Sequence, residues 1–327
     1  MSVEERPADG NGRPGAIDPL ELARLASLEL RARVIVEGAF SGMHHNLHPG
    51  TSIEFTEHKE YAPGDEIRRI DWKAVGRIDR YYVKRFEDET EMRTYLVVDA
   101  SASMGYQRKG VSKLAYASYL AGAFAYLLGK QGDPTGLFLF DTQTRHYLPP
   151  STRPGQIREI FRLLDGAAAE GTTDPARALS HVGEVLDKRS LVLFFSDLLD
   201  AEPDGVMPGR RADAAAARGP MAERLRQLRA RGHDVVVFHV LDPDEVELPF
   251  DDLTFFQGME PGDGRTLLAQ AADLREAFKR ESAAFRDRWR LACLETHVEY
   301  RFTRTDQRPA EVLREFLVTR QKGRVRR

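Results

Sequence analysis

Cysteine is almost absent from this sequence, which holds one, Cys293, among 327 residues. A single thiol allows no intramolecular disulfide and no cysteine-rich zinc site. Because disulfide-stapled domains belong to oxidising compartments, this scarcity favours a reducing environment. The sequence therefore predicts a cytoplasmic protein whose fold depends on an apolar core.

Long apolar runs and an excess of one charge are absent too. No stretch reaches the roughly 18 consecutive apolar residues of a membrane span, and residues 1–15 carry no apolar signal-peptide core. Lys and Arg number 48 against 51 Asp and Glu, which gives a formal net charge of -3. Dedicated nucleic-acid binders usually show a basic excess. We therefore expect neither a membrane span nor a nucleic-acid partner.

From residue 93 onward, short apolar runs alternate with segments of helical periodicity. The runs are continuous in apolar character, as strands buried on both faces of a sheet are. Strands are predicted at 93–99, 135–141, 191–197, 234–242 and 296–302, with an edge strand at 145–150 and a last helix at 309–319. The alternation predicts an α/β fold with a mostly parallel sheet and helices on both faces.

The chain divides into segments of different composition. Residues 18–37 begin with Asp18 as an N-cap and predict a leading helix, whose apolar face we expect to pack on its own chain. His44, His45 and His48 lie in a turn-rich stretch and fit no zinc-site spacing. The expected segments are a disordered N-terminus (1–17), the leading helix, a β-rich module (38–92), the α/β domain (93–305) with a loop insertion (201–220), and a C-terminal helix and basic tail (306–327).

The stretch LVVDASASM carries the most informative chemistry. Asp99 ends a predicted central strand, and Ser101 and Ser103 follow at every second position. Ligands of open α/β sheets gather outside the carboxyl ends of the strands. Carboxylate and hydroxyl oxygens are hard ligands that suit Mg²⁺ or Mn²⁺. This spacing therefore favours a divalent cation at the end of that strand.

Two further segments supply oxygen ligands at the same edge of the predicted sheet. EGTTDPARAL places Thr172 and Thr173 before a helix, and FFSDLLD places Asp197 at the end of another apolar strand. Asp99, Ser101, Ser103, Thr173 and Asp197 would hold one cation and leave a position open for water or a partner's carboxylate. The alternative is structural, with Asp99 and Asp197 as strand-end caps and Thr173 as a helix N-cap.

The same three motifs, DASAS, GTTD and FFSD, resemble the metal-ion-dependent adhesion site of von Willebrand factor A domains. Upstream, SGMHHNLHPGTSIEF, HKEYAPGDEIRRIDWKAVGR and YYVKRFEDE resemble the signature of the DUF58 family. The resemblance covers about residues 20–305 and implies a Rossmann-type A-domain fold with all five metal positions. It favours Thr173 over Thr172, because Thr173 precedes Asp174 and Ala178-Leu179 as the family's threonine does.

The resemblance implies a function as well as a fold. Family members are typically encoded beside MoxR-type AAA+ ATPases and are thought to act as their adaptors. We therefore expect a non-enzymatic protein that binds a carboxylate of this ATPase, or of its client, through Mg²⁺ or Mn²⁺. A Mg²⁺-dependent phosphohydrolase using the same Asp, Ser and Thr residues is the alternative, because strand-end acids with Mg²⁺ also serve phosphoryl transfer.

Overall fold

The computed structural model describes residues 17–41, 58–60, 82–84, 92–199, 219–262 and 264–325. The chain forms two compact units, one built from residues 1–42 and 92–327 and the other from residues 43–91. In the second unit, β1 (His58–Glu60) pairs antiparallel with β2 (Tyr82–Lys84). His44, His45, His48 and almost all of the expected insertion at 201–220 lie outside the described residues.

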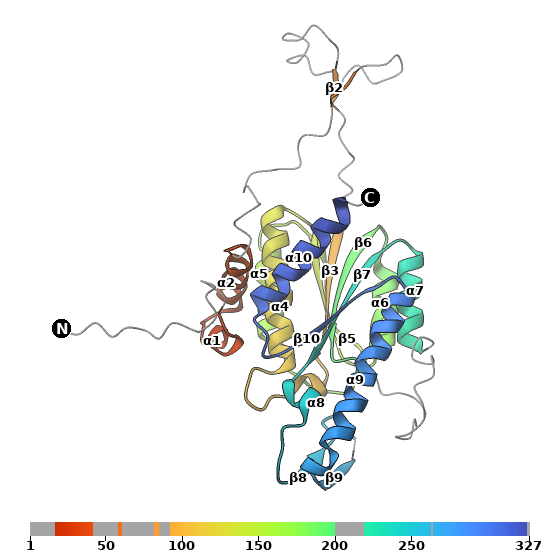
Figure 1. Ribbon diagram of the computed structural model, residues 1–327. Coiled ribbons are helices and arrows are strands. Elements are labelled where there is room, and N and C mark those ends of the chain that lie inside the picture. Colours follow the sequence, from red (N-terminus) through yellow and green to blue (C-terminus); the bar gives the residue numbers. More distant parts are fainter. Residues whose placement is uncertain are drawn as a thin grey trace, which may run out of the picture. The chain divides into compact units, whose positions relative to one another are not determined.

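A six-stranded sheet forms the centre of the first unit (Figure 1). Its strand order is β10-β7-β6-β3-β4-β5, and every neighbouring pair is parallel except β4 and β5. The strands are β3 (Arg93–Asp99), β4 (Thr135–Phe140), β5 (Thr144–Ser151), β6 (Ser190–Ser196), β7 (Asp234–Leu241) and β10 (Glu299–Arg304). The predicted fold class, a mostly parallel sheet in an α/β domain, is confirmed.

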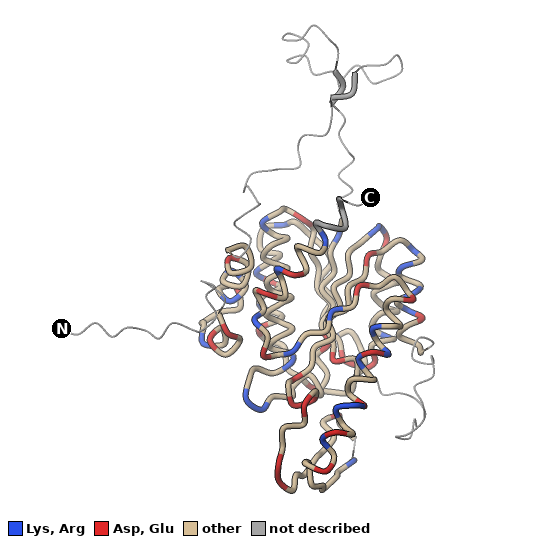
Figure 2. The backbone as a smooth tube through the Cα atoms, in the orientation of Figure 1, with Lys and Arg blue, Asp and Glu red and all other residues tan. Residues whose placement is uncertain are grey.

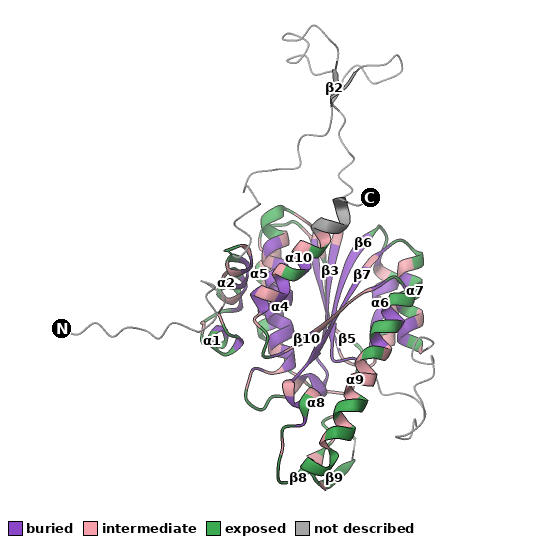
Figure 3. Ribbon diagram, viewed as in Figure 1, coloured by how far each residue is buried: buried purple, intermediate pink, exposed green. Residues whose placement is uncertain are grey.

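Helices cover both faces of this sheet because its strands alternate their apolar side chains between the faces. Leu96 and Val98 of β3 join one core cluster, whereas Tyr95 and Val97 join the other. The first cluster includes α2 (Leu28–Ser41), α4 (Lys113–Gln131), α5 (Gln156–Asp165) and α10 (Pro309–Val325). The second includes α6 (Pro175–Val185), α7 (Pro220–Ala230) and α9 (Ala271–Glu295). The sheet is thus buried from both sides (Figure 3).

The leading segment differs from the single helix expected at 18–37. It forms two helices, α1 (Pro19–Ala23) and α2, and Asp18 caps the first with the predicted capping box. The last helix also runs further than expected, because α10 continues to Val325. Among the described helices, none is long and apolar enough to cross a membrane.

Three short elements lie near the carboxyl ends of the parallel strands. A 3₁₀ helix, η2 (Ala102–Gly105), follows β3 directly, and α8 (Pro243–Glu247) follows β7. The strands β8 (Leu253–Gln257) and β9 (Thr266–Gln270) pair only with each other, so they form a hairpin separate from the main sheet. These elements surround the candidate site.

The packing of α2 on the first unit generates a stability prediction. Ile35 is 1% exposed in the core, whereas Leu30 on the same helix is 41% exposed. We expect Ile35→Ala to lower the free energy of unfolding by about 2–4 kcal/mol through lost burial and a cavity, measured by urea denaturation. Leu30→Ala is the matched control, with an expected change of about 0.5 kcal/mol or less. Equal effects of the two substitutions would contradict the packing.

Candidate functional site

The predicted site residues lie at the carboxyl ends of two adjacent parallel strands. Asp99 is the last residue of β3, and Asp197 directly follows β6, its neighbour in the sheet. Strands β4 and β6 lie on opposite sides of β3, although they follow it in chain order. The chain therefore reverses its direction of winding at β3, which is where open α/β sheets form ligand crevices.

Asp99 is the centre of a buried hydrogen-bond cluster. Its Oδ1 accepts a hydrogen bond from the Ser101 backbone N–H at 3.0 Å. Its Oδ2 accepts hydrogen bonds from the hydroxyls of Thr173 at 3.2 Å and Ser196 at 2.7 Å. As expected, Thr173 is the threonine whose hydroxyl contacts Asp99.

The remaining predicted residues connect to this cluster. The hydroxyls of Ser101 and Ser103 lie 3.2 Å apart and share a hydrogen bond. Burial favours a raised pKa for Asp197, but the Lys113 ammonium and hydrogen bonds from Lys113 and Ser103 lower that pKa below its ordinary value. The structure therefore brings all five predicted residues together, and none of them is more than 7% exposed.

Backbone contacts position the loop that carries Thr173. The Ala102 N–H donates to the Gly171 carbonyl at 2.9 Å, and the Glu170 N–H donates to the Ala100 carbonyl at 3.0 Å. Gly171 has a φ of +75°, a left-handed conformation that glycine adopts without the strain a β-carbon brings. Two loops from distant parts of the sequence are thus held side by side.

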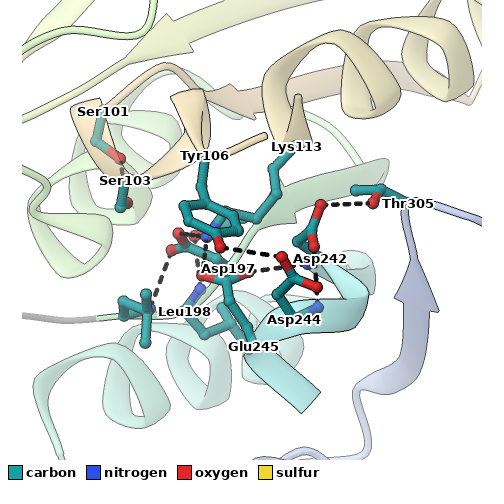
Figure 4. Close-up of polar contacts among 12 residues, drawn as sticks. Ser101, Ser103, Tyr106, Lys113, Asp197, Leu198, Asp242, Asp244, Glu245 and Thr305 are labelled. Carbon is teal, nitrogen blue, oxygen red and sulfur yellow. Dashed lines mark hydrogen bonds and ion pairs between the residues drawn. The ribbon is translucent and has the colours of Figure 1, made fainter. Parts of the chain in front are cut away.

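An unpredicted lysine occupies the other side of Asp197. Lys113 is fully buried, and its Nζ lies 2.7 Å from Asp197 Oδ2 and 2.6 Å from Glu245 Oε1 (Figure 4). Burial favours a lowered pKa for Lys113, but the negative charges of Asp197 and Glu245 raise it above its ordinary value. Lys113 is therefore a permanent ammonium that compensates these two carboxylates.

Aspartate and glutamate positions recur along the chain in and after α8, as the colouring of Figure 2 shows. Glu245 also closes a capping box with Asp242. Asp244 accepts hydrogen bonds from the Arg108 guanidinium and, at 3.2 Å, from the Tyr106 hydroxyl. These contacts fix the segment after η2 against α8, on the Asp197 side of the site.

Asp99 has no comparable cation. Among the described residues, no Lys or Arg forms an ion pair with it. Burial, followed by the negative charge of Asp197, raises the pKa of Asp99 to about 7, although hydrogen bonds from Ser101 and Ser196 oppose the rise. A divalent cation beside Asp99 would remove this electrostatic penalty.

The donor set fits a hard cation better than a transition metal. In the described part of the chain, no group of three or more His, Cys, Asp or Glu is arranged to hold a metal ion. The cluster instead combines the carboxylates of Asp99 and Asp197 with the hydroxyls of Ser101, Ser103 and Thr173. All-oxygen sets of this kind suit Mg²⁺ and Mn²⁺. Whether an ion binds here stays a prediction.

Sequence reasoning missed Lys113, Ser196 and Glu245. Ser196 directly precedes Asp197, and Glu245 stands three residues after Asp242, which is the capping-box spacing. The positions of Ser196 and Glu245 could therefore have been predicted from the sequence. Lys113 begins an Ala- and Leu-rich helix, where a lysine is usually solvated, so its burial follows only from the tertiary fold.

The sequence matches the family model described as "Protein of unknown function DUF58" over residues 57–288. It is 30% identical over 274 residues to the uncharacterized protein Rv1480 of Mycobacterium tuberculosis, which covers 82% of this chain and 80% of that protein.

Two solved structures align loosely with this chain. BatB from Bacteroides thetaiotaomicron is 15% identical over 71% of this chain and 99% of its own, with a TM-score of 0.42. A von Willebrand factor type A protein from Catenulispora acidiphila is 13% identical over 59% of this chain and 42% of its own, with a TM-score of 0.33. Alignments this loose carry no functional argument.

The Lys113 ion pairs generate one prediction. We expect Lys113→Met to lower the free energy of unfolding by about 3 kcal/mol or more, because it leaves Asp197 and Glu245 buried without a cation. Lys109→Met is the control, since Lys109 is exposed and its loss should cost less than about 1 kcal/mol. Both are measured by urea denaturation at pH 7, and a Lys113→Met cost as small as the control's would refute the assignment.

The raised pKa of Asp99 predicts a pH dependence. A folded-state pKa near 7 means that the folded chain holds this proton more tightly than the unfolded chain, whose aspartates titrate near 3.8. The stabilisation is complete below about pH 4 and is lost as the pH rises through 7.

In EDTA, the free energy of unfolding should therefore fall between pH 5 and pH 8, by on the order of 2 kcal/mol. Asp99→Asn should flatten this slope, because an amide does not titrate. The comparison with wild type isolates Asp99 from neighbouring groups such as Asp197. An unchanged slope in the variant would show that Asp99 titrates normally.

Proposed function

Because this chain belongs to the DUF58 family, we propose that it is a non-enzymatic adaptor that binds a partner's carboxylate through a divalent cation. Asp99, Ser101, Ser103, Thr173 and Asp197 would hold Mg²⁺ or Mn²⁺. The carrying observation is Asp99, a fully buried carboxylate that is surrounded by hydroxyl donors and lacks a cationic partner among the described residues. The bound ion would supply the missing positive charge and an electrophilic centre for an incoming carboxylate.

The mixture of ligands supports binding rather than catalysis. Three of the five donors are neutral hydroxyls, so the ion would keep much of its positive charge for a partner's carboxylate. A phosphohydrolase of this type needs an acid free to act as a base. Asp197, the second acid, is held by Lys113 at 2.7 Å and by the Leu199 N–H at 3.1 Å. This engagement argues against Asp197 as that base.

The proposed partner is a MoxR-type AAA+ ATPase or a client delivered to it. This part of the proposal rests on the family resemblance, since members are typically encoded beside such ATPases. Such ATPases need ATP, which the cytoplasm supplies. We therefore propose that the two proteins meet in the cytoplasm. The adaptor would contribute to the assembly or maturation of other proteins by presenting them to the ATPase.

Metal binding is the first test of the proposal. Titration calorimetry should show Mg²⁺ or Mn²⁺ binding to the wild-type chain, with binding abolished in Asp99→Asn. Thr173→Ala should weaken binding about tenfold, because it removes a hydroxyl at the site. Thr319→Ala is the matched control, since Thr319 is an exposed residue of α10 whose hydroxyl bonds within its own helix. Equal cation binding by wild type and Asp99→Asn would reject the site.

Partner binding is the second test. A purified MoxR-type ATPase from the same genome should be retained by the immobilised chain in Mg²⁺, released by EDTA, and lost with Asp99→Asn. Retention that is indifferent to both EDTA and the substitution would reject the carboxylate-bridging mechanism. Metal-dependent turnover of a phosphoester panel, lost with Asp197→Ala, would favour the phosphohydrolase instead.

A further inference from the structure

The tip of the β8–β9 hairpin lies against the candidate site. Gly105 ends η2, the helix that contains Ser103. A β-carbon built at Gly105 would lie 3.9 Å from Cε of Met259, which follows β8. Figure 1 shows the hairpin beyond the same end of the sheet as α8. The residue after Met259 is Glu260, so an acidic side chain stands next to the cluster.

Glu260 directly follows Met259, so it belongs to the part of the hairpin that lies against η2. Burial and the negative charge of Asp197 raise the pKa of Glu260, whereas hydrogen bonding from the backbone of Ser103 and Thr173 and from the Ser103 hydroxyl opposes the rise. One oxygen, Oε1, is buried and has no hydrogen-bond partner in the described structure. Glu260 therefore presents an unsatisfied oxygen to a site that already contains two carboxylates.

This arrangement is costly unless a cation is present. A buried carboxylate oxygen without a partner loses its hydration and gains nothing in return. Lys113 does not serve Glu260, because its described ion pairs are with Asp197 and Glu245. A divalent ion held by the five predicted ligands would supply positive charge both to Asp99 and to the unsatisfied oxygen of Glu260. The unsatisfied Oε1 of Glu260 is thus free to coordinate a metal ion.

The five predicted ligands are themselves shielded from solvent. They are almost fully buried, although they stand at the edge of the sheet where a partner would approach. The hairpin itself is thinly packed, since Leu253, Phe255 and Leu268 are each at least 60% exposed (Figure 3). Its strands have no partner in the main sheet. The β8–β9 hairpin is therefore less firmly packed than the buried ligands of the site.

We propose that Glu260 is an internal ligand that fills the cation's partner position until a partner's carboxylate displaces it. This inference rests on the proposed function of the same site. It also specifies the partner's chemistry, because a competitor must reproduce what Glu260 offers. The tip reads Met259-Glu260-Pro261-Gly262, an acid in a tight turn preceded by an apolar residue. The expected partner presents an exposed turn with an acidic side chain next to an apolar one.

The test uses the full chain, Mg²⁺ alone, and a synthetic peptide that copies residues 257–264, QGMEPGDG. We expect Glu260→Gln to bind Mg²⁺ about tenfold more weakly than wild type, because the variant lacks a charged ligand. In saturating Mg²⁺, the same variant should bind the peptide at least about tenfold more tightly, because the internal competitor is weakened. Asp252→Asn, at an exposed acid before β8, should change neither value.

A second readout does not depend on affinity. Hydrogen exchange at residues 258–262 should slow in wild type when Mg²⁺ is added, and this protection should be absent in Glu260→Gln. Circular dichroism of both variants checks that they fold.

The outcomes separate this inference from the proposed function. No Mg²⁺ binding by wild type overturns both. Mg²⁺ binding that Asp99→Asn abolishes but Glu260→Gln leaves unchanged, with equal peptide binding and equal exchange, overturns the internal ligand alone.

Discussion

The buried ammonium of Lys113 is the interaction on which the carboxyl-terminal edge of the sheet depends. It joins α4 to Asp197 after β6 and to Glu245 in α8, at distances of 2.7 and 2.6 Å. Charges buried in a protein interior must be paired, because their lost hydration costs several kcal/mol each. The lysine thus sets where α8 lies, and α8 in turn holds the segment after η2 through Asp244 and Arg108.

The two acids of the site differ because one of them has this internal cation and the other does not. Asp197 is compensated by Lys113, so its pKa is lowered, whereas burial and the charge of Asp197 raise the pKa of Asp99. In the described part of the chain, the buried Lys113 therefore compensates the neighbouring acid, and Asp99 is surrounded by hydroxyl and N–H donors instead. In our proposal, this asymmetry is what reserves one place for an external cation.

The sequence could predict the acids of the site that stand at the ends of strands. Asp99 and Asp197 close continuous apolar runs, and the alternation of runs and helices placed both acids at one edge of a parallel sheet. Lys113 and Glu260 were not predictable in the same way. A lysine in the first turn of a helix and a glutamate in a turn are both typical of solvated positions, and only long-range packing buries Lys113 and the Oε1 atom of Glu260. The break of the leading helix into α1 and α2 carried no glycine or proline signal either.

The packing of α2 has a consequence for how the chain is made. This helix follows α1 near the start of the described residues, yet its buried face contacts α4 and also α10, the last described helix. Between α2 and α4 the ribosome must make the whole of the second unit. The apolar face of α2 therefore stays uncovered until α4 has been made, and its contacts are complete only when α10 emerges. Nascent chains of this protein should be good clients for chaperones that shield exposed apolar helices.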